Sequence, residues 1–170
     1  ELHLLDVIVP APRAKLHELP RVGSDRSYVS LDAGLASLHT DLRHPERDIA
    51  VFARASRYGT PSHQHADQGD FAILAGGRGL IIPSGSFGYQ FGEEHHRVWT
   101  QQTVAANCIL VDGCGQKKES AEATGRIEPE LENGDVSRLK LHLEPAYPML
   151  TKYLRTLVFN HVTGVLVVTD

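Results

Sequence analysis

The sequence predicts an all-β protein built as an antiparallel sandwich or barrel. Short runs of alternating apolar and polar residues recur along the chain at regular spacing. Turn-forming residues separate these runs, with 15 glycines and 9 prolines among 170 residues. Helical periodicity is weak throughout, so an antiparallel sheet that is layered or closed fits the pattern best.

The first part of the chain indicates a series of hairpins. Strands are expected at residues 28–31, 34–40, 49–55, 71–76 and 80–82. The charged segment 41–48 is a loop between the second and third strands. Gly76-Gly77, flanked by two apolar runs, is a tight-turn signal and marks the clearest hairpin of the sequence.

The second part opens with a long loop at residues 83–96, rich in glycine and aromatic residues. Long loops on β scaffolds are frequently functional. Further strands are expected at residues 105–111, 125–130, 136–143, 153–159 and 164–168, with 125–130 exposed and a turn at Asp112-Gly113. Leu139, Leu141 and Leu143 alternate with polar residues, so they should share the buried face of one strand.

The chain suits one domain over residues 28–170, preceded by a linker or entry segment at 1–27 that prolines interrupt. It begins at Glu1 rather than methionine and ends in a strand pattern, so we expect a piece of a longer protein, truncated at both ends. The net charge of −4 gives no attraction to nucleic acid or anionic membranes. No apolar run is long enough to span a bilayer, and Cys108 and Cys114 make no disulfide framework.

Histidine chemistry centres on residues 62–70, where His63 and His65 lie two positions apart. In a strand, both rings would point to one face. Histidine is the side chain whose charge changes nearest neutral pH, and it is a common metal ligand. A pair of hydrogen-bonded surface histidines is the plain alternative.

One interpretation rests on spacing alone. His63, His65 and Asp70, followed by Gly77 and Pro83-x-Gly85, are similar to the two-part motif of cupin barrels. Imidazole and carboxylate suit Fe, Mn, Ni or Zn. The pattern departs from cupins at Asp70, where they have glutamate, and at Gly88, where they have a further histidine.

A second resemblance covers more of the chain. Residues 57–69, with the sequence RYGTPSHQHADQG, resemble the signature of heparinase II/III-like polysaccharide lyases, which include oligoalginate lyases. Residues 75–85, 95–100, 102–116 and 153–170 are similar to later segments of that family, in the same order. The resemblance therefore runs from about residue 28 to the end of the chain.

This resemblance implies a multi-stranded antiparallel β-sandwich of the super-sandwich type, preceded in the family by a helical toroid that carries a catalytic tyrosine and another histidine. It also implies β-elimination in acidic, uronate-containing polysaccharides such as alginate or glycosaminoglycans, outside the cytoplasm. The chain alone should then be inactive or nearly so. A non-catalytic carbohydrate-binding module remains an alternative.

The same resemblance assigns roles to individual residues. His63 would neutralise the substrate carboxylate or transfer a proton, with Gln64, Arg97 and Asn107 as supporting contacts. Apart from the resemblance, the aromatic composition of the 83–96 loop suggests that Tyr89 either stacks on a sugar ring or closes over the core. Asp67 would orient an imidazole or cap a turn. For Arg97 and Asn107, a solvated charge and a hydrogen-bonded strand residue are the structural alternatives.

No cofactor is expected to be required. His65 matches a zinc-ligand position of several of these lyases, but the other two ligand positions are Pro83 and Ala106. Because neither side chain can bind a metal and structural zinc sites normally use four ligands, the site should be absent or rebuilt with His95 or His96. His65 would then be a packed, hydrogen-bonded histidine.

Overall fold

The computed structural model describes residues 26–85, 93–131 and 134–170. Within them, the strands form two antiparallel sheets in which each strand pairs with its neighbours in sequence. The first sheet contains β1 (Ser27–Ser30), β2 (Leu35–His39), β3 (Ile49–Arg54), β4 (Phe71–Ala75) and β5 (Arg78–Ile81). The second contains β6 (Arg126–Leu131), β7 (Val136–His142), β8 (Leu154–Asn160) and β9 (Leu166–Thr169).

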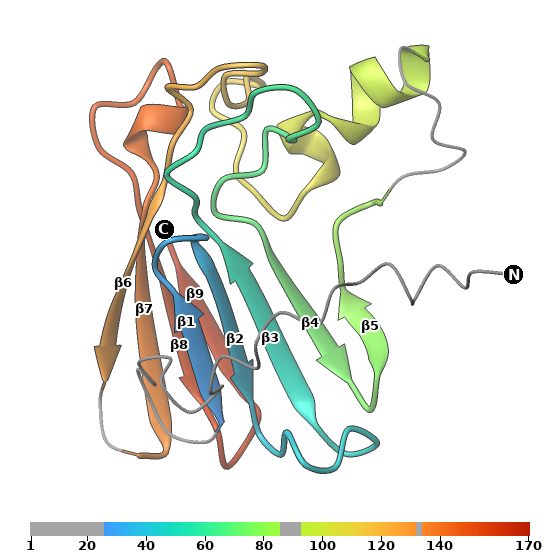
Figure 1. Ribbon diagram of the computed structural model, residues 1–170, viewed down its shortest axis with the longest axis vertical. Helices are drawn as coiled ribbons and strands as arrows, with labels where there is room; N and C mark the ends of the chain where they lie inside the picture. Colours follow the sequence, from blue (N-terminus) through green and yellow to red (C-terminus); the bar gives the residue numbers. More distant parts are fainter. Residues whose placement is uncertain (1–25, 86–92, 132–133) are drawn as a thin grey trace, which may run out of the picture.

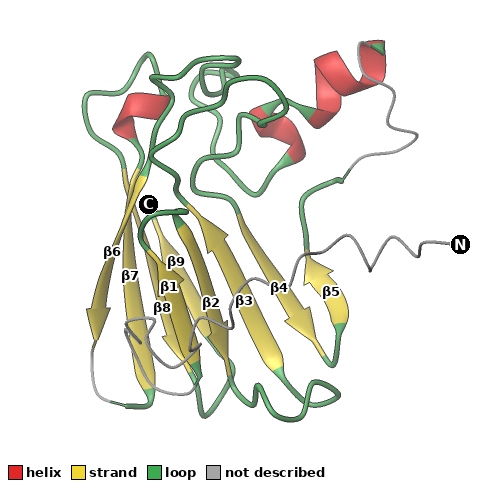
Figure 2. Cartoon of the chain, viewed as in Figure 1, coloured by secondary structure: helices red, strands yellow, loops and turns green. Residues whose placement is uncertain are grey.

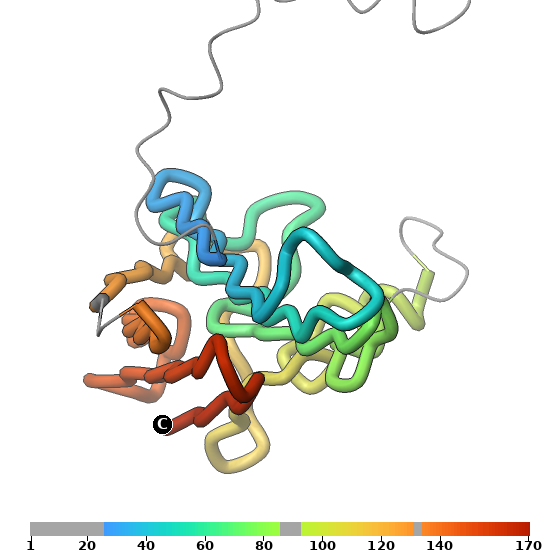
Figure 3. The backbone as a smooth tube through the Cα atoms, turned by 90° about the horizontal axis from the view of Figure 1, so that it is seen from below, coloured from blue at the N-terminus to red at the C-terminus, as the bar shows by residue number. Residues whose placement is uncertain are grey.

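The two sheets are packed as layers, which confirms the predicted all-β sandwich. Figure 1 shows the first sheet in front, and the view from below in Figure 3 separates its blue-to-green strands from the orange-to-red strands of the second sheet. The core lies between them because alternate side chains of each strand face inward. Leu38 and Val51 of the first sheet and Leu141 and Phe159 of the second are all at most 1% exposed.

Two predicted turns are confirmed with their backbone geometry. Gly76 and Gly77 have φ of 54° and 74°, as a two-residue turn between β4 and β5 requires. Asp112 and Gly113 have φ of 51° and 76°, and an antiparallel bridge joins the residues on either side of them. Glycine and aspartate tolerate the left-handed region, so these dipeptides are good turn signals.

The predicted strand at 105–111 is wrong. Residues Thr103–Ala105 form a 3₁₀ helix, and the following residues form a single bridge between Val111 and Cys114. Ile109 and Val111 nevertheless pack against the core. The apolar run therefore reflects burial of a loop rather than pairing in a sheet.

Three other boundaries differ from expectation. The strand at 125–130 is an edge strand, where Pro129 is tolerated, but Ile127 is buried rather than exposed. The loop predicted at 83–96 does not extend to its expected end, since a π-helix spans His96–Thr100. Most of the 1–27 segment lies outside the described residues.

The longer connections gather at one end of the sandwich. The loop from β3 to β4, the segment joining the two sheets and the connection from β7 to β8 all lie at the top of Figure 2, together with the short helices. The loop between β2 and β3 and the turns between β4 and β5 and between β8 and β9 lie at the other end, whereas the turn between β1 and β2 lies at the loop-rich end (Figure 1). The histidine motif belongs to the loop-rich end.

Candidate active-site loop

The loop at residues 55–70 is held by two buried glutamines. The side chain of Gln68 accepts a hydrogen bond from the backbone N–H of Ser56 at 2.7 Å and donates to Ala123 O at 2.9 Å. Gln116 accepts from the backbone N–H of Gln68 at 2.8 Å and donates to its carbonyl at 2.7 Å. Both side chains satisfy loop backbone groups that would otherwise be buried without partners.

Two glycines let the loop approach the rest of the domain. Gly59 has φ of 68°, and a Cβ there would lie 2.5 Å from the carbonyl oxygen of Ser120. Gly69 has φ of 87°, and a Cβ there would lie 2.4 Å from Leu143 Cδ1. The glycines of the motif thus fix the path of the backbone around the histidines.

His63 lies on the exposed surface of this loop, next to a turn in which Ser62 has φ of 59°. The neighbouring Gln64 is also exposed, and its Oε1 accepts a hydrogen bond from Arg54 Nη2 at 2.6 Å. Arg54 also forms an ion pair with Asp67. Arg54, the last residue of β3, therefore contacts the loop that carries His63 at two positions. The partner found for Asp67 is this arginine rather than an imidazole.

His65 occupies a different environment from His63. The segment is a loop, so the expected shared strand face is wrong: His63 is exposed and His65 is half-buried. The ring of His65 contacts that of His96 edge-on, with centroids 5.9 Å apart. Burial lowers the pKa of His65, with smaller contributions from the nearby charges of His96 and Arg54. The neutral imidazole is therefore favoured at position 65.

A small cavity of about 150 Å³ lies beside His65. Pro83 and Ala106 line it together with His65 and Asp67. The three positions matched to zinc ligands thus come together in space, although two of them have no ligand atom. Among the residues that the structure describes, no group of three His, Cys, Asp or Glu side chains could hold a metal ion. The side chains present do not fit the zinc site that the resemblance implied.

The expected supporting residues have separate locations. Arg97 is exposed in the π-helix, where its carbonyl accepts a hydrogen bond from Gln102 Nε2 at 2.6 Å. Asn107 is half-buried, and its Nδ2 donates to the carbonyl of Phe71 at 2.9 Å, which ties it to β4. Tyr89 lies outside the described residues.

Arg155 was not singled out by sequence reasoning, yet it connects the sheet to the site. It is 3% exposed, and its Nη1 donates to the carbonyls of Gly69 and Asn107 at 2.8 and 2.6 Å. Its Nε donates to Asp170 at 2.7 Å. The available signal was the alternation of β8, in which position 155 lies on the same face as the buried Leu157.

Comparison with known proteins assigns this architecture. The family model described as "Heparinase II/III-like, C-terminal" matches residues 25–170. The chain belongs to the heparinase II/III-like family. The part of these polysaccharide lyases that it matches is the C-terminal domain.

Solved structures agree with the fold of this heparinase II/III-like domain. The heparinase III product of BT4657 superimposes with a TM-score of 0.62 at 20% identity, covering 84% of this chain and 21% of that one. The heparan sulfate lyase HepC from Pedobacter heparinus gives a TM-score of 0.63 at 22% identity, covering 80% and 20%. The chain therefore spans about a fifth of the length of either structure. No curated protein matches it.

The family assignment overturns the cupin interpretation. Asp70, the third ligand in that scheme, is half-buried and accepts the backbone N–H of Asn107 at 2.8 Å. Burial raises the pKa of Asp70, against the effect of that hydrogen bond. In this heparinase II/III-like domain, Asp70 immediately precedes β4.

In the described residues, no helix is long and apolar enough to cross a bilayer.

Proposed function

We propose that this chain is the β-sandwich part of a lyase that cleaves uronate-containing polysaccharides or oligosaccharides by β-elimination. The family match over residues 25–170 carries the proposal. Two structural neighbours are a heparinase III and a heparan sulfate lyase, so a glycosaminoglycan is a substrate class to test, beside alginate. A polymer of this kind is met outside the cytoplasm, in the periplasm or medium.

His63 is the residue to which we assign the chemistry in this domain. The C5 proton of a uronate is weakly acidic because the adjacent carboxylate is already negative. A donor must therefore neutralise that carboxylate as charge develops, or a base must remove the proton. An exposed imidazole on a loop held by Gln68, Gln116 and Arg54 meets the need for a positioned group.

We assign the remaining catalytic groups to a helical toroid that precedes this domain. The family resemblance implies that the toroid carries a catalytic tyrosine and a second histidine. The chain covers about a fifth of each solved relative, which leaves ample length for such a domain. We expect the 170-residue chain alone to show little or no lyase activity. Gln64, an exposed residue next to His63 on the loop, is proposed as a substrate contact, with Arg97 on the neighbouring helix.

The test is a lyase assay of the complete polypeptide that carries this domain. Alginate, hyaluronan and heparan sulfate are supplied, and the ultraviolet absorbance of the unsaturated product is followed. His63→Ala should lower kcat by about 10²–10⁴-fold, the usual contribution of a positioned proton-transfer group. His44→Ala is the matched control, because His44 is an exposed histidine in the loop between β2 and β3.

Two results would contradict the proposal at different levels. No unsaturated product from any uronate polymer would remove the lyase assignment. Full activity in the His63→Ala variant would leave a lyase but remove His63 from its role.

A further inference from the structure

A second polar cluster lies at the end of the sandwich opposite the histidine loop. Asp48 immediately precedes β3 and is 7% exposed. Its Oδ1 accepts hydrogen bonds from the backbone N–H groups of Thr40 and Asp41, both at 2.9 Å. Its other oxygen, Oδ2, lies 2.6 Å from His39 Nδ1. The carboxylate is thus fixed in orientation, with Oδ2 facing the imidazole of His39.

His39, the last residue of β2, is 8% exposed and lies between this carboxylate and a hydroxyl group. Its Nε2 is 2.5 Å from Ser37 Oγ. The ionised Asp48 accepts only, so His39 Nδ1 carries the proton and Nε2 has the lone pair that receives the Ser37 O–H. The ring of Phe52 covers His39 edge-on, with centroids 5.8 Å apart. This is the tautomer and orientation that a general base for a serine requires.

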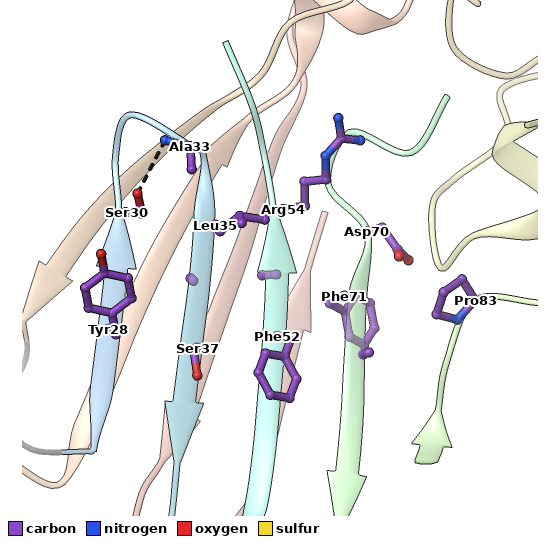
Figure 4. Close-up of a pocket in the computed structure, with 13 residues that line it drawn as sticks. Tyr28, Ser30, Ala33, Leu35, Ser37, Phe52, Arg54, Asp70, Phe71 and Pro83 are labelled. Carbon is purple, nitrogen blue, oxygen red and sulfur yellow. Dashed lines mark hydrogen bonds between the residues drawn. The ribbon is translucent and has the colours of Figure 1, made fainter. Parts of the chain in front are cut away.

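Ser37 faces a cavity through which a substrate can reach its hydroxyl group. It lines a cavity of about 520 Å³ on the outer face of the first sheet. In the sheet register it is paired with Tyr28 on one side and Phe52 on the other, and Figure 4 shows its hydroxyl between the two rings. The cavity walls are mostly apolar. Leu35 and Phe71 lie nearer the loop end of the sheet than Ser37 does (Figure 4).

We propose that Ser37, His39 and Asp48 form a nucleophilic site that accepts the acyl group of carboxylic esters with short apolar acyl chains. Ser37 Oγ attacks the ester carbonyl carbon, and its proton passes to His39 Nε2. Collapse of the tetrahedral adduct breaks the bond to the leaving oxygen, which takes that proton and departs as an alcohol. The product is an ester on Ser37, and Asp48 stabilises the imidazolium that forms in between.

The position of Ser37 also determines how far the reaction goes. β2 lies between β1 and β3, so the sheet ladder uses its backbone N–H groups. A serine on such a strand has no backbone donor of its own to stabilise an oxyanion, which is a major part of turnover in serine hydrolases. Acylation and deacylation both pass through such an oxyanion, so both are slowed. An ester with a good leaving group, such as p-nitrophenolate, still acylates Ser37, whereas the acyl-serine has a poor alkoxide leaving group and is hydrolysed more slowly. We therefore expect one round of acylation by activated esters rather than sustained hydrolysis.

The experiment uses the 170-residue chain with p-nitrophenyl butyrate and, separately, a fluorophosphonate probe. The expected result is a burst of up to one equivalent of p-nitrophenol and a single modification that mass spectrometry places on Ser37. Ser37→Ala should abolish both, since the change removes only the hydroxyl oxygen and should leave the fold intact. Ser30→Ala is the matched control, because Ser30 lines the same cavity.

Asp48→Asn tests the relay, because an amide can keep the backbone hydrogen bonds but favours the wrong tautomer of His39. Its labelling rate should fall by about 10²-fold or more, with circular dichroism confirming that the variant folds. No burst and no labelling of the wild type would overturn the proposal. So would labelling that persists in Ser37→Ala or an unchanged rate in folded Asp48→Asn.

Discussion

Pro83 and Ala106 are the residues that separate this chain from the zinc-binding pattern of the lyases it resembles. Both line the cavity beside His65, so the positions are still assembled although the ligands are missing. The space is present, but neither of these two side chains can bind a metal. The ring of His65, which lines this cavity, contacts the ring of His96 edge-on.

We predict that the double substitution Pro83→Asp with Ala106→His creates a zinc-binding site. It would place a carboxylate and a second imidazole around the cavity with His65, leaving the fourth position to water. Metal analysis after dialysis should give about one zinc per chain for the double variant and none bound stoichiometrically to the wild type. Adding His65→Ala to the double variant is the control, and zinc content that is independent of position 65 would refute the prediction.

At the scale of elements, the strands that pair in hairpins were predictable and the apolar loop was not. The alternation in β7 and β8 specifies both the strands and their buried faces, because a strand presents every second side chain to the core. The apolar run ending at Val111 has similar composition, but it covers the core from a loop. Apolar composition indicates that a segment is buried. Whether that segment pairs in a sheet depends on the presence of a neighbouring strand.

The inward face of β8 gives a prediction about stability. Leu157 is fully buried, whereas the adjacent Val158 is half-buried on the opposite face. Leu157→Ala should lower the free energy of unfolding by about 2–5 kcal/mol, because it leaves a cavity between the sheets. Val158→Ala should cost about 1 kcal/mol or less. Urea denaturation measures both, and equal losses would contradict the assignment of faces.

For the whole molecule, the carboxylates of Asp48, Asp70 and Asp170 differ in how their surroundings shift their pKa values. Although burial acts to raise the pKa of Asp170, the hydrogen bond and charge of Arg155 hold it below the usual value. Burial also opposes ionisation of Asp48, yet hydrogen bonds from Asp41 and His39 lower its pKa. Asp70 is the opposite case, since burial raises its pKa.

The lowered pKa values of Asp170 and Asp48 predict acid destabilisation. A carboxyl group whose pKa is lower in the folded state stabilises the fold above its unfolded pKa of about 3.9, and this contribution is lost as the pH falls through the folded pKa. The free energy of unfolding should therefore decrease below about pH 4. Asp170→Asn should flatten part of that decrease. Denaturant titrations from pH 6 downward measure it, and identical pH profiles for the two proteins would refute the role of the Arg155–Asp170 pair.

The sequence by itself determined the sandwich, the turns at Gly76-Gly77 and Asp112-Gly113, and the histidine-bearing loop. These follow from local rules: side-chain alternation, glycine at positive φ and residue types in a short motif. Only the tertiary structure decided that His63 is exposed while His65 is half-buried, that Pro83 and Ala106 share a cavity, and that Asp48 lies behind His39 and Ser37. The first two facts depend on contacts between segments distant in sequence, and the third depends on the register of the β2–β3 hairpin. Neither the packing of the loops nor the register is recorded in a local pattern.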